Sequence, residues 1–356
     1  MTLSRREFLA LLGGTAIVGS SLWRVKTTEA KAWSFEDFTQ HIQSGGPPKD
    51  GIPPIDRPKY ISAAEADKFL KPNDIVFGLD RHGLVKAYPQ KILVWHEIVN
   101  DEVKGEKIAV TYCPLTGSAL GFRGRSRDGA MLTFGTSGKL VNSNLLMYDQ
   151  QTDSQWPQIL GIAIDGKCKG TALEEISLGW TQWSRWRQRH PDTVVLSTDT
   201  GYFRSYGTDP YGSYDKSRTY YDSGAPLFPV MANNDRFSPK EVVVGVKVNG
   251  RQMAVSKQGL RKKSVINTTL AGLPLVGTYD PELELARVFV RQVNGQPTNL
   301  SSAKGRIVDE LTHSQWTPAG RAVEGRAMGT QLKQQPCFDV MWFAWYAFFP
   351  GTQVLS

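Results

Sequence analysis

The chain repeats parts of itself, and this repetition limits its possible folds more than any other feature. Asp153-Ser-Gln-Trp156 returns as His313-Ser-Gln-Trp316, and Thr111-Tyr-Cys-Pro114 returns as Thr278-Tyr-Asp-Pro281. The repeats lie about 160 residues apart, and a duplication of this kind indicates two similar supersecondary units. We therefore predict a β-dominated α+β protein, in which an internal duplication gives two pseudo-equivalent β-rich lobes, each closed by one helix.

Short runs rich in Val, Ile and Tyr, separated by turn-forming residues, make up most of both lobes. In the first copy this pattern extends from Ile75 to Asp149. In the second copy Val248-Asn-Gly250 and Val293-Asn-Gly295 favour tight hairpin turns, because Asn-Gly adopts the backbone geometry that matches strand twist. Each copy ends in one helical pattern, at Trp180–His190 and at Phe338–Phe349.

Composition changes along the chain suggest five parts. Residues 198–239 are rich in Tyr, Asp, Gly and Ser and lack clear periodicity, and such a long connection usually carries function or covers a site. A flexible linker is the alternative. The predicted parts are an export signal at residues 1–32, a lead-in segment at 33–72, a first repeat lobe with the active site at 73–197, the connection at 198–239 and a structural second lobe at 240–356.

The N-terminal residues have the pattern of an export signal. Ser4-Arg-Arg-Glu-Phe-Leu9 is a twin-arginine motif, followed by the apolar run Leu9–Leu22 and a small-residue site at Ala30-Lys-Ala32. We therefore predict a periplasmic or cell-surface protein. Basic residues after the apolar run leave open a second possibility, in which the signal is retained as a membrane anchor. A cytoplasmic protein with a chance Arg-Arg pair is the third.

The charge pattern argues against nucleic acid as a partner. The formal net charge is +8, but the basic residues are dispersed and the longest run is Arg261-Lys-Lys263. A surface that binds nucleic-acid phosphates needs clustered cations. We expect no nucleic-acid partner, and contact with a membrane only through an uncleaved signal.

Three cysteines in an oxidising compartment allow one disulfide and one free thiol. Cys168 and Cys337 lie at non-equivalent places in their repeats, so neither is required by the duplication. The simplest assignment pairs these two across the lobes and leaves Cys113 free.

The first copy contains a cysteine and a histidine that the second copy lacks. The positions that match His96 and Cys113 hold Lys263 and Asp280. If the two surrounding segments are antiparallel strands, residues pair when their numbers sum to about 209, which places His96 opposite Cys113. Glu97 joins this site only if a bulge turns its side chain, because side chains alternate along a strand. The catalytic candidates are therefore Cys113, His96 and Glu97.

A thiol beside an imidazole has two chemical uses. His96 can take the proton from Cys113 and make a nucleophilic thiolate, or both side chains can bind a transition metal. For the metal we expect copper before zinc, with Glu97, Tyr148 or Met147 as the third ligand. In the alternative without function, Cys113 is a small buried apolar residue.

The segment 135–144 is the second candidate site. It is longer than its counterpart and offers backbone amides, hydroxyl groups and a cation, which suit a carboxylate, a phosphate or a sugar. A hairpin connection built of turn-forming residues is the alternative. The residues predicted to bind a ligand here are Gly135, Ser137, Gly138, Lys139, Asn142 and Asn144, together with Tyr148.

Several motifs resemble a known family. They are Trp95-His-Glu-Ile-Val-Asn-Asp101, Thr111-Tyr-Cys-Pro-Leu-Thr-Gly117, Asn142–Trp156 and Trp342-Phe-Ala-Trp345. In these motifs and their order, the chain resembles the prokaryotic domain-of-unknown-function family 3179 across roughly residues 50–356. The resemblance implies an exported or lipoprotein-like globular protein and no particular activity. In that family the Cys-Pro-Leu motif often continues with a second Cys where this chain has Thr116, so the resemblance does not imply a two-cysteine redox centre here.

Three functions remain open from the sequence. The first is a Cys113–His96 site that binds copper or zinc for redox chemistry or metal handling. The second is a metal-free thiol enzyme in which Cys113 attacks an acyl or disulfide substrate and His96 is the base. The third is a non-catalytic module that binds a glycan, a peptide or another partner through residues 135–144 and the aromatic side chains between Tyr202 and Tyr221.

Overall fold

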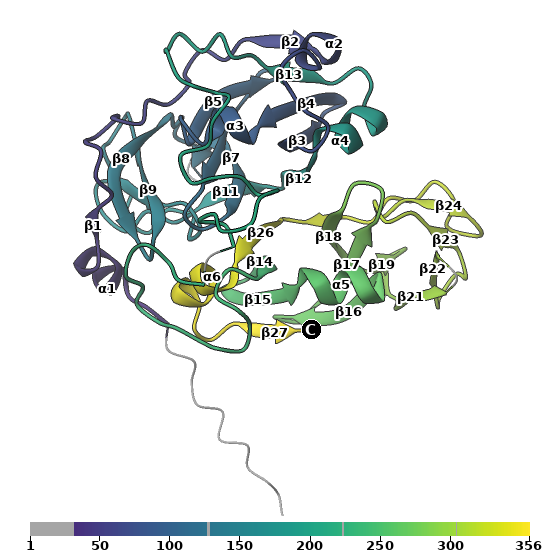
Figure 1. Cartoon of the computed structure of the whole chain (residues 1–356). Helices are drawn as coiled ribbons and strands as arrows, with labels where there is room; N and C mark the ends of the chain where they lie inside the picture. The colour runs from purple at the N-terminus through teal and green to yellow at the C-terminus, as the bar shows by residue number, and fades with distance from the viewer. Residues whose placement is uncertain (1–31, 127–128, 223, 304) are drawn as a thin grey trace, which may run out of the picture. The chain divides into compact units, whose positions relative to one another are not determined.

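Strands joined by short turns make up most of the chain, and the helices are few and short (Figure 1). The computed structural model describes residues 32–126, 129–222, 224–303 and 305–356, all of which belong to one compact unit. The predicted export signal lies outside the described residues, apart from its last residue. Within the described ranges, no helix is long and apolar enough to cross a membrane. The prediction of a β-dominated protein is confirmed.

The first part of the chain, residues 43–196, forms three sheets. Their strand orders are β12-β3-β4-β13-β2, β11-β7-β6-β5 and β1-β8-β9-β10. The strands are β1 (Gln43–Ser44), β2 (Tyr60–Ser62), β3 (Ile75–Arg81), β4 (Leu84–Pro89), β5 (Ile98–Val103), β6 (Glu106–Cys113), β7 (Ser118–Ser126), β8 (Phe134–Val141), β9 (Asn144–Asp149), β10 (Gln155–Pro157), β11 (Leu173–Ile176), β12 (Gly179–Gln182) and β13 (Val194–Leu196).

The second part of the chain, residues 242–355, forms four sheets among the described residues. Their orders are β26-β14-β15-β27, β16-β17-β18-β25, β19-β20 and β21-β22-β23-β24. The strands are β14 (Val242–Val248), β15 (Arg251–Ser256), β16 (Val265–Leu270), β17 (Leu273–Asp280), β18 (Leu285–Val290), β19 (Gln292–Val293), β20 (Gln296–Pro297), β21 (Leu300–Ala303), β22 (Arg306–Asp309), β23 (Gln315–Trp316), β24 (Ala322–Glu324), β25 (Gln334–Gln335), β26 (Cys337–Met341) and β27 (Gln353–Leu355).

The helices are one or two turns long. They are α1 (Phe35–Gln40), α2 (Ala63–Ala66), α3 (Gln90–Leu93), α4 (Trp183–Arg189), α5 (Lys257–Lys263) and α6 (Trp342–Phe348). The two helices expected from the sequence correspond to α4 and α6, and each begins several residues later than predicted. Turn residues end the strands as expected, since Asn249 and Gly250 both have positive φ angles, of 46° and 76°, between β14 and β15.

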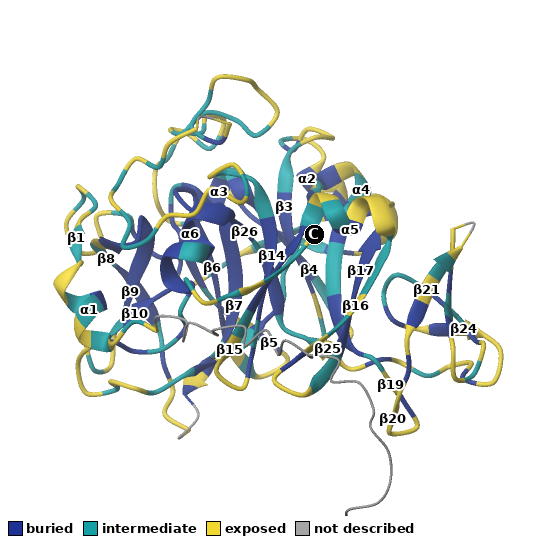
Figure 2. Ribbon diagram, turned by 90° about the horizontal axis from the view of Figure 1, so that it is seen from below, coloured by how far each residue is buried: buried dark blue, intermediate teal, exposed yellow. Residues whose placement is uncertain are grey.

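Helix α6 joins the core of the first part of the chain. Trp342 and Trp345 are fully buried in a cluster that also contains Cys113, Leu146 and Trp156, and Figure 2 shows this helix largely in the colour of buried residues. An apolar helix this short is a core element, because a membrane span needs about 20 apolar residues. The run Trp342–Phe349 is apolar nearly all round, as a buried helix requires.

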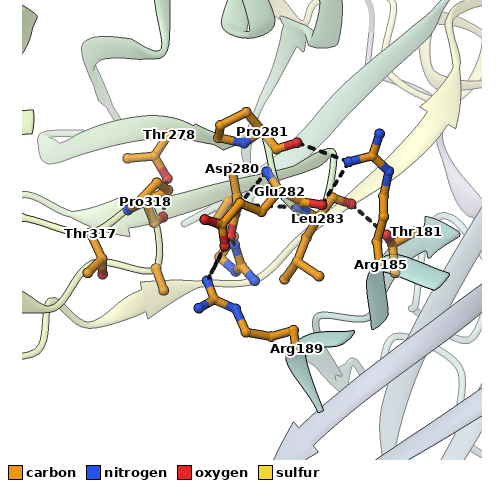
Figure 3. A network of polar contacts seen from close by, with 12 residues as sticks. Thr181, Arg185, Arg189, Thr278, Asp280, Pro281, Glu282, Leu283, Thr317 and Pro318 are labelled. Atoms are coloured by element: carbon orange, nitrogen blue, oxygen red, sulfur yellow. Dashed lines mark hydrogen bonds and ion pairs between the residues drawn. The ribbon is translucent and has the colours of Figure 1, made fainter. Parts of the chain in front are cut away.

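A second junction between the two parts lies where α4 meets the end of β17. Figure 3 shows Arg185 donating hydrogen bonds to the carbonyl oxygens of Pro281 and Glu282, at 3.2 and 2.8 Å. Asp280 forms an ion pair with Arg189 at 3.7 Å and accepts a hydrogen bond from the Glu282 backbone at 3.1 Å. At the position that matches Cys113, the second part therefore holds a carboxylate that is fully engaged in structural contacts.

The predicted disulfide between Cys168 and Cys337 is wrong. Both side chains are free thiols, as is that of Cys113. Cys337 is on β26, inside an apolar cluster with Val244 and Leu275, whereas Cys168 follows β10 and has the Thr152 hydroxyl 3.5 Å from its sulfur. The two cysteines belong to different packing clusters, and the number of cysteines alone carried no information about this.

Candidate functional site

Glu97, which lies between α3 and β5, has a left-handed backbone conformation. The register predicted for these strands is confirmed, since Ile98 pairs with Thr111. Before Ile98, however, Glu97 has a φ of 56°, and its backbone oxygen accepts a hydrogen bond from the Tyr112 amide at 2.8 Å. A positive φ is uncommon for a residue other than Gly and interrupts strand alternation. The turn that would bring Glu97 into the site is therefore present.

His96 lies beside the site and is held by other partners. Its Nδ1 is 2.8 Å from the Pro53 carbonyl oxygen and its Nε2 is 2.6 Å from the Tyr206 hydroxyl. A carbonyl oxygen can only accept, so Nδ1 carries the proton and Nε2 accepts from Tyr206. Burial lowers the pKa of His96, which favours this neutral form. His96 makes no polar contact with Cys113 in the described structure, so the structure does not bring these two predicted partners together.

Cys113 ends β6 and is almost completely buried, with 1% of its surface exposed. Its sulfur lies 3.9 Å from the carbonyl oxygen of Ser143. The pKa of the thiol is raised to about 11, first by burial and then by the charge of Glu97. Hydrogen bonds from Thr116 and from the Leu145 backbone act in the opposite direction, because they stabilise the thiolate.

The carboxyl group of Glu97 is the unusual feature of this site. The residue is 7% exposed, and its side chain has no hydrogen bond or ion pair with any described residue. Burial alone raises its pKa to about 8. Among the described residues, Gln155 Oε1 is the side-chain oxygen or nitrogen that is fully enclosed and has no hydrogen-bond partner. The Glu97 oxygens also have no partner but are not fully enclosed, so they still reach space open to solvent. Glu97 is thus an acid–base group poised near neutral pH.

The connection 198–239, called the cover here, lies over this site. The pKa of Tyr211 is raised by burial first and then by the charges of Glu97 and Cys113, so its phenol lies close enough to both groups for their charges to act on it. The Tyr211 hydroxyl has no hydrogen-bond partner among the described residues. The ring of the neighbouring Tyr220 is tilted against that of Tyr211, with centroids 5.8 Å apart, and its hydroxyl donates to the Leu115 carbonyl oxygen at 2.6 Å.

Buried hydroxyl groups hold the cover in place. Tyr214 and Tyr221 of the cover stack at 3.7 Å, and both hydroxyls lie within 3.3 Å of the Tyr112 hydroxyl on β6. Asp209 accepts hydrogen bonds from Tyr221 and from Gln90 of α3, each at 2.8 Å. The abundance of Tyr indicated a cover in the sequence, but none of these partners was identifiable from spacing.

The predicted ligand loop 135–144 is the hairpin β8–β9, and most of its residues serve packing. A Cβ on Gly135 would lie 2.5 Å from the Tyr148 ring, and one on Gly138 would lie 2.3 Å from the Pro47 carbonyl oxygen. Asn142 accepts a hydrogen bond from the Met231 amide at 2.8 Å, and Asn144 donates to Thr116 and Gln158 and accepts from Ile159. Steric need and buried hydrogen bonds thus account for the Gly and Asn residues of this hairpin.

Four of the predicted ligand residues nevertheless line one cavity of about 590 Å³. They are Ser137, Gly138, Lys139 and Tyr148, and the opposite wall is the lead-in segment from Ile42 to Lys49. Gln155, whose Oε1 has no hydrogen-bond partner among the described residues, also lines this cavity. Neither Cys113 nor Glu97 lines this cavity, so the two candidate sites of the sequence are separate places in the structure.

The donors for a metal ion are incomplete at Cys113. The described residues contain no group of three or more His, Cys, Asp or Glu side chains placed to hold an ion. A thiol and one carboxyl are available, and both nitrogens of His96 are already engaged. Structural and catalytic zinc sites use at least three protein ligands. The residues present do not fit the copper or zinc site expected from the sequence.

A family model for a protein of unknown function, DUF3179, matches residues 49–352. The chain belongs to this family. No curated protein and no solved structure matches this chain. The resemblance inferred from the sequence motifs is confirmed, and the roles of individual residues rest on the geometry described above.

Proposed function

We propose that Cys113 and Glu97 form a thiol site that accepts an acyl group from a small substrate admitted beneath the cover. The observation that carries this proposal is the buried carboxyl of Glu97, which has no hydrogen-bond partner among the described residues and whose charge raises the pKa of the Cys113 thiol. Burying a carboxyl without a hydrogen-bond partner destabilises the fold. Groups kept in so unfavourable a state, with a pKa displaced towards neutrality, are concentrated at catalytic sites.

Each side chain has a defined part in the proposed reaction. Glu97 takes the thiol proton while the Cys113 sulfur bonds to the acyl carbon, and the same carboxyl then protonates the leaving group as its bond to carbon breaks. Thr116 and the Leu145 amide stabilise the thiolate, and the Tyr211 hydroxyl is available to donate to the acyl oxygen. Water hydrolyses the thioester in a second half-reaction.

This assignment differs from the sequence hypotheses in its base. Glu97, and not His96, is the base, because the imidazole of His96 is hydrogen-bonded to the Pro53 carbonyl oxygen and to Tyr206 of the cover. The role we propose for His96 is to hold the cover closed. Non-catalytic binding of a glycan or peptide would instead use the cavity beside Lys139, and that function would not require the sulfur of Cys113.

Acylation by p-nitrophenyl acetate at pH 8 tests whether Glu97 is the base or only repels the thiolate of Cys113. If Glu97 is the base, Glu97→Gln slows acetylation of Cys113 by about a hundredfold, the lower end of general-base effects. If Glu97 only repels the thiolate, the same substitution lowers the thiol pKa and speeds acetylation, because Glu97 raises that pKa. Mass spectrometry of cysteine-containing peptides measures the rate at each thiol.

Cys337 is the internal control for this experiment. It is buried like Cys113 and burial raises its pKa to about 12, but Glu97 is not among the groups that act on it. Its slow acetylation should be the same in wild type and in Glu97→Gln. Equal changes at both cysteines would mean that the variant loosens the whole protein, and the proposed role of Glu97 would then be wrong.

We propose further that the two parts of the chain are pseudo-equivalent lobes. Matching contacts support this: Glu97 and Ser264 have φ angles of 56° and 63° and accept hydrogen bonds from Tyr112 and Tyr279. The paired aromatic contacts agree, since Trp156 donates to Asp149 at 3.0 Å and Trp316 donates to Asp309 at 2.9 Å. In this proposal the lobes share a scaffold, and only the first keeps a thiol.

Equivalent glycines test the shared scaffold. A Cβ on Gly78 would lie 2.2 Å from the Trp186 ring, and one on Gly245 would lie 2.3 Å from the Trp345 ring. Gly78→Ala and Gly245→Ala should each lower the free energy of unfolding by about 1–3 kcal/mol, the usual effect of overpacking. Gly207→Ala, where nothing lies within 4 Å, is the control. Urea denaturation that shows either core substitution to be as harmless as the control would contradict the proposal.

A further inference from the structure

One lysine and one aspartate lie in contact inside the first part of the chain. Lys86 is on β4 and Asp101 is on β5, and these strands belong to different sheets. The Lys86 Nζ lies 2.9 Å from Oδ1 of Asp101 and 2.7 Å from Oδ2, so it is close to the carboxyl carbon that joins the two oxygens. The two side chains are 6% and 4% exposed. An amine and a carboxyl group are thus held together where little water reaches them.

Two tyrosine hydroxyls distinguish the oxygens of this carboxyl group. Tyr60 and Tyr88 both donate to Oδ2 of Asp101, at 2.5 and 2.6 Å, whereas Oδ1 has Lys86 as its hydrogen-bond partner among the described residues. Donors aimed at one oxygen stabilise the negative charge that develops there when a nucleophile adds to the carbon. The two hydroxyls are therefore placed as an oxyanion hole for Oδ2, and Oδ1 is the oxygen that can leave.

These polar residues are particular to the first copy of the repeat. In the second copy, the positions that match Lys86, Tyr88 and Asp101 hold Met253, Val255 and Thr268. The second copy nevertheless forms the matching hairpin, β14–β15, with the same antiparallel pairing. Burying two charges often costs more free energy than packing apolar residues in their place. A hairpin of this kind does not require the charged pair, so its burial calls for another explanation.

We propose that Lys86 and Asp101 form an intramolecular amide bond between Lys86 Nζ and the side-chain carboxyl carbon of Asp101. One proton passes from Nζ to Oδ1, which gives a neutral amine and a carboxylic acid. The amine adds to the carbon, a second proton passes to Oδ1, and Oδ1 leaves as water while Oδ2 becomes the amide oxygen. Two of the three ammonium protons end in the water and one stays on the amide nitrogen, so no co-reactant is consumed. This modification goes beyond the function proposed for Cys113 and does not depend on it.

Two physical effects favour the amide over the ion pair. Groups fixed in contact react as if each were present at about 10⁵–10⁸ M, which favours condensation despite the surrounding water. The amide is also neutral, so its formation removes the cost of keeping two charges away from solvent. The bond joins β4 to β5 and so links two sheets of the first part covalently.

Mass spectrometry of the purified full-length chain, denatured before measurement, tests the proposal. We expect wild type to be lighter by one water than the unlinked chain. Trypsin cannot cleave after an acylated lysine, so its digest should contain a branched peptide in which residues 82–91, uncleaved after Lys86, are joined to residues 92–104 through Asp101.

Lys257 and Asp339 are the internal control in the same digest. They also form an ion pair, but their side chains are 21% and 10% exposed, and no tyrosine hydroxyl among the described residues donates to Asp339. This pair should remain unlinked. The double variant with Lys86→Met and Asp101→Leu lacks both reacting groups and should have the mass of an unlinked chain.

Tyr60→Phe tests the assigned mechanism, because it removes one donor to Oδ2 and keeps the ring and the ion pair. Loss of one oxyanion donor should slow bond formation by about a hundredfold. The linked fraction, measured at successive times after synthesis begins, gives the rate for the variant and for wild type.

Three results would overturn the proposal. They are an unlinked wild-type chain that trypsin cleaves after Lys86, a loss of water that persists in the double variant, and linkage of Lys257 to Asp339 at the same level as Lys86 to Asp101. The second result would place the lost water at another residue, for example in a succinimide at Asp165-Gly166. A wild-type rate in Tyr60→Phe would contradict the oxyanion hole.

Discussion

At pH 9, the Glu97→Gln variant is expected to have a free energy of unfolding up to about 5 kcal/mol higher than wild type, while at pH 4 the two proteins should be nearly equal. The reason is the buried carboxyl, whose pKa is raised to about 8 in the folded protein. In the unfolded chain a glutamate has a pKa of about 4.3. A neutral amide avoids the cost of ionising this position.

The sign follows from proton binding. Between pH 4.3 and 8, roughly, the unfolded chain has lost the Glu97 proton and the folded chain still holds it, so wild-type stability falls by about 1.4 kcal/mol per pH unit. Above pH 8 both states are ionised and the loss stops growing. The difference between variant and wild type isolates this group from all others that titrate.

Urea denaturation at intervals from pH 2 to 9 measures the effect, and Glu106→Gln is a control with the opposite sign. Hydrogen bonds from Arg81 lower the pKa of Glu106 to about 2, and those from Arg123 and His82 contribute. Its charged form stabilises the fold at neutral pH and is lost as the pH falls towards 2. A stability difference for Glu97→Gln that does not change with pH would show that Glu97 ionises normally, and the acid–base role would be lost with it.

Removing Asp101 should have the second large effect, a loss of about 3–5 kcal/mol in the free energy of unfolding. Asp101 accepts hydrogen bonds from Lys86 at 2.7 Å, from Tyr60 at 2.5 Å and from Tyr88 at 2.6 Å. The side chains of Lys86 and Asp101 are only 6% and 4% exposed. Asp101→Ala would leave a buried ammonium ion and two phenol hydroxyls without their acceptor.

A double variant and a surface pair make this prediction specific. Lys86→Met with Asp101→Leu removes both charges together and should cost less than Asp101→Ala alone, since an unpaired buried charge is worse than none. Lys59 and Asp199 form an exposed pair at 2.7 Å, and Lys59→Ala should change stability by less than about 1 kcal/mol. If Asp101→Ala is as mild as Lys59→Ala in denaturant unfolding, the buried ion pair does not hold these sheets together.

The sequence was a good guide where local patterns decide the structure. The register of β5 against β6, the Asn-Gly turns and the burial of α6 were all predictable, because alternation, turn residues and apolar helix faces act over a few neighbouring positions. The Lys86–Asp101 pair was missed, although two opposite charges inside apolar strand patterns were a usable signal.

Features set by distant contacts were not predictable. The positive φ that turns Glu97 towards Cys113 depends on how α3 ends, and His96 is drawn away by Pro53 and by Tyr206, which is more than a hundred residues later. The Gly135 position is explained by the Tyr148 ring across the hairpin rather than by a ligand. Each of these required the packed structure.

The cover changes which quantity governs the chemistry at Cys113. With 1% of Cys113 exposed, oxidants and substrates reach the sulfur only while the cover is displaced. Such gating motions take microseconds to milliseconds in many enzymes. The lifetime of the reduced thiol, and in the proposed reaction the upper limit on turnover, are then set by the opening frequency of a segment anchored at Tyr112 and His96. Selectivity among reagents becomes a matter of what can pass during one opening.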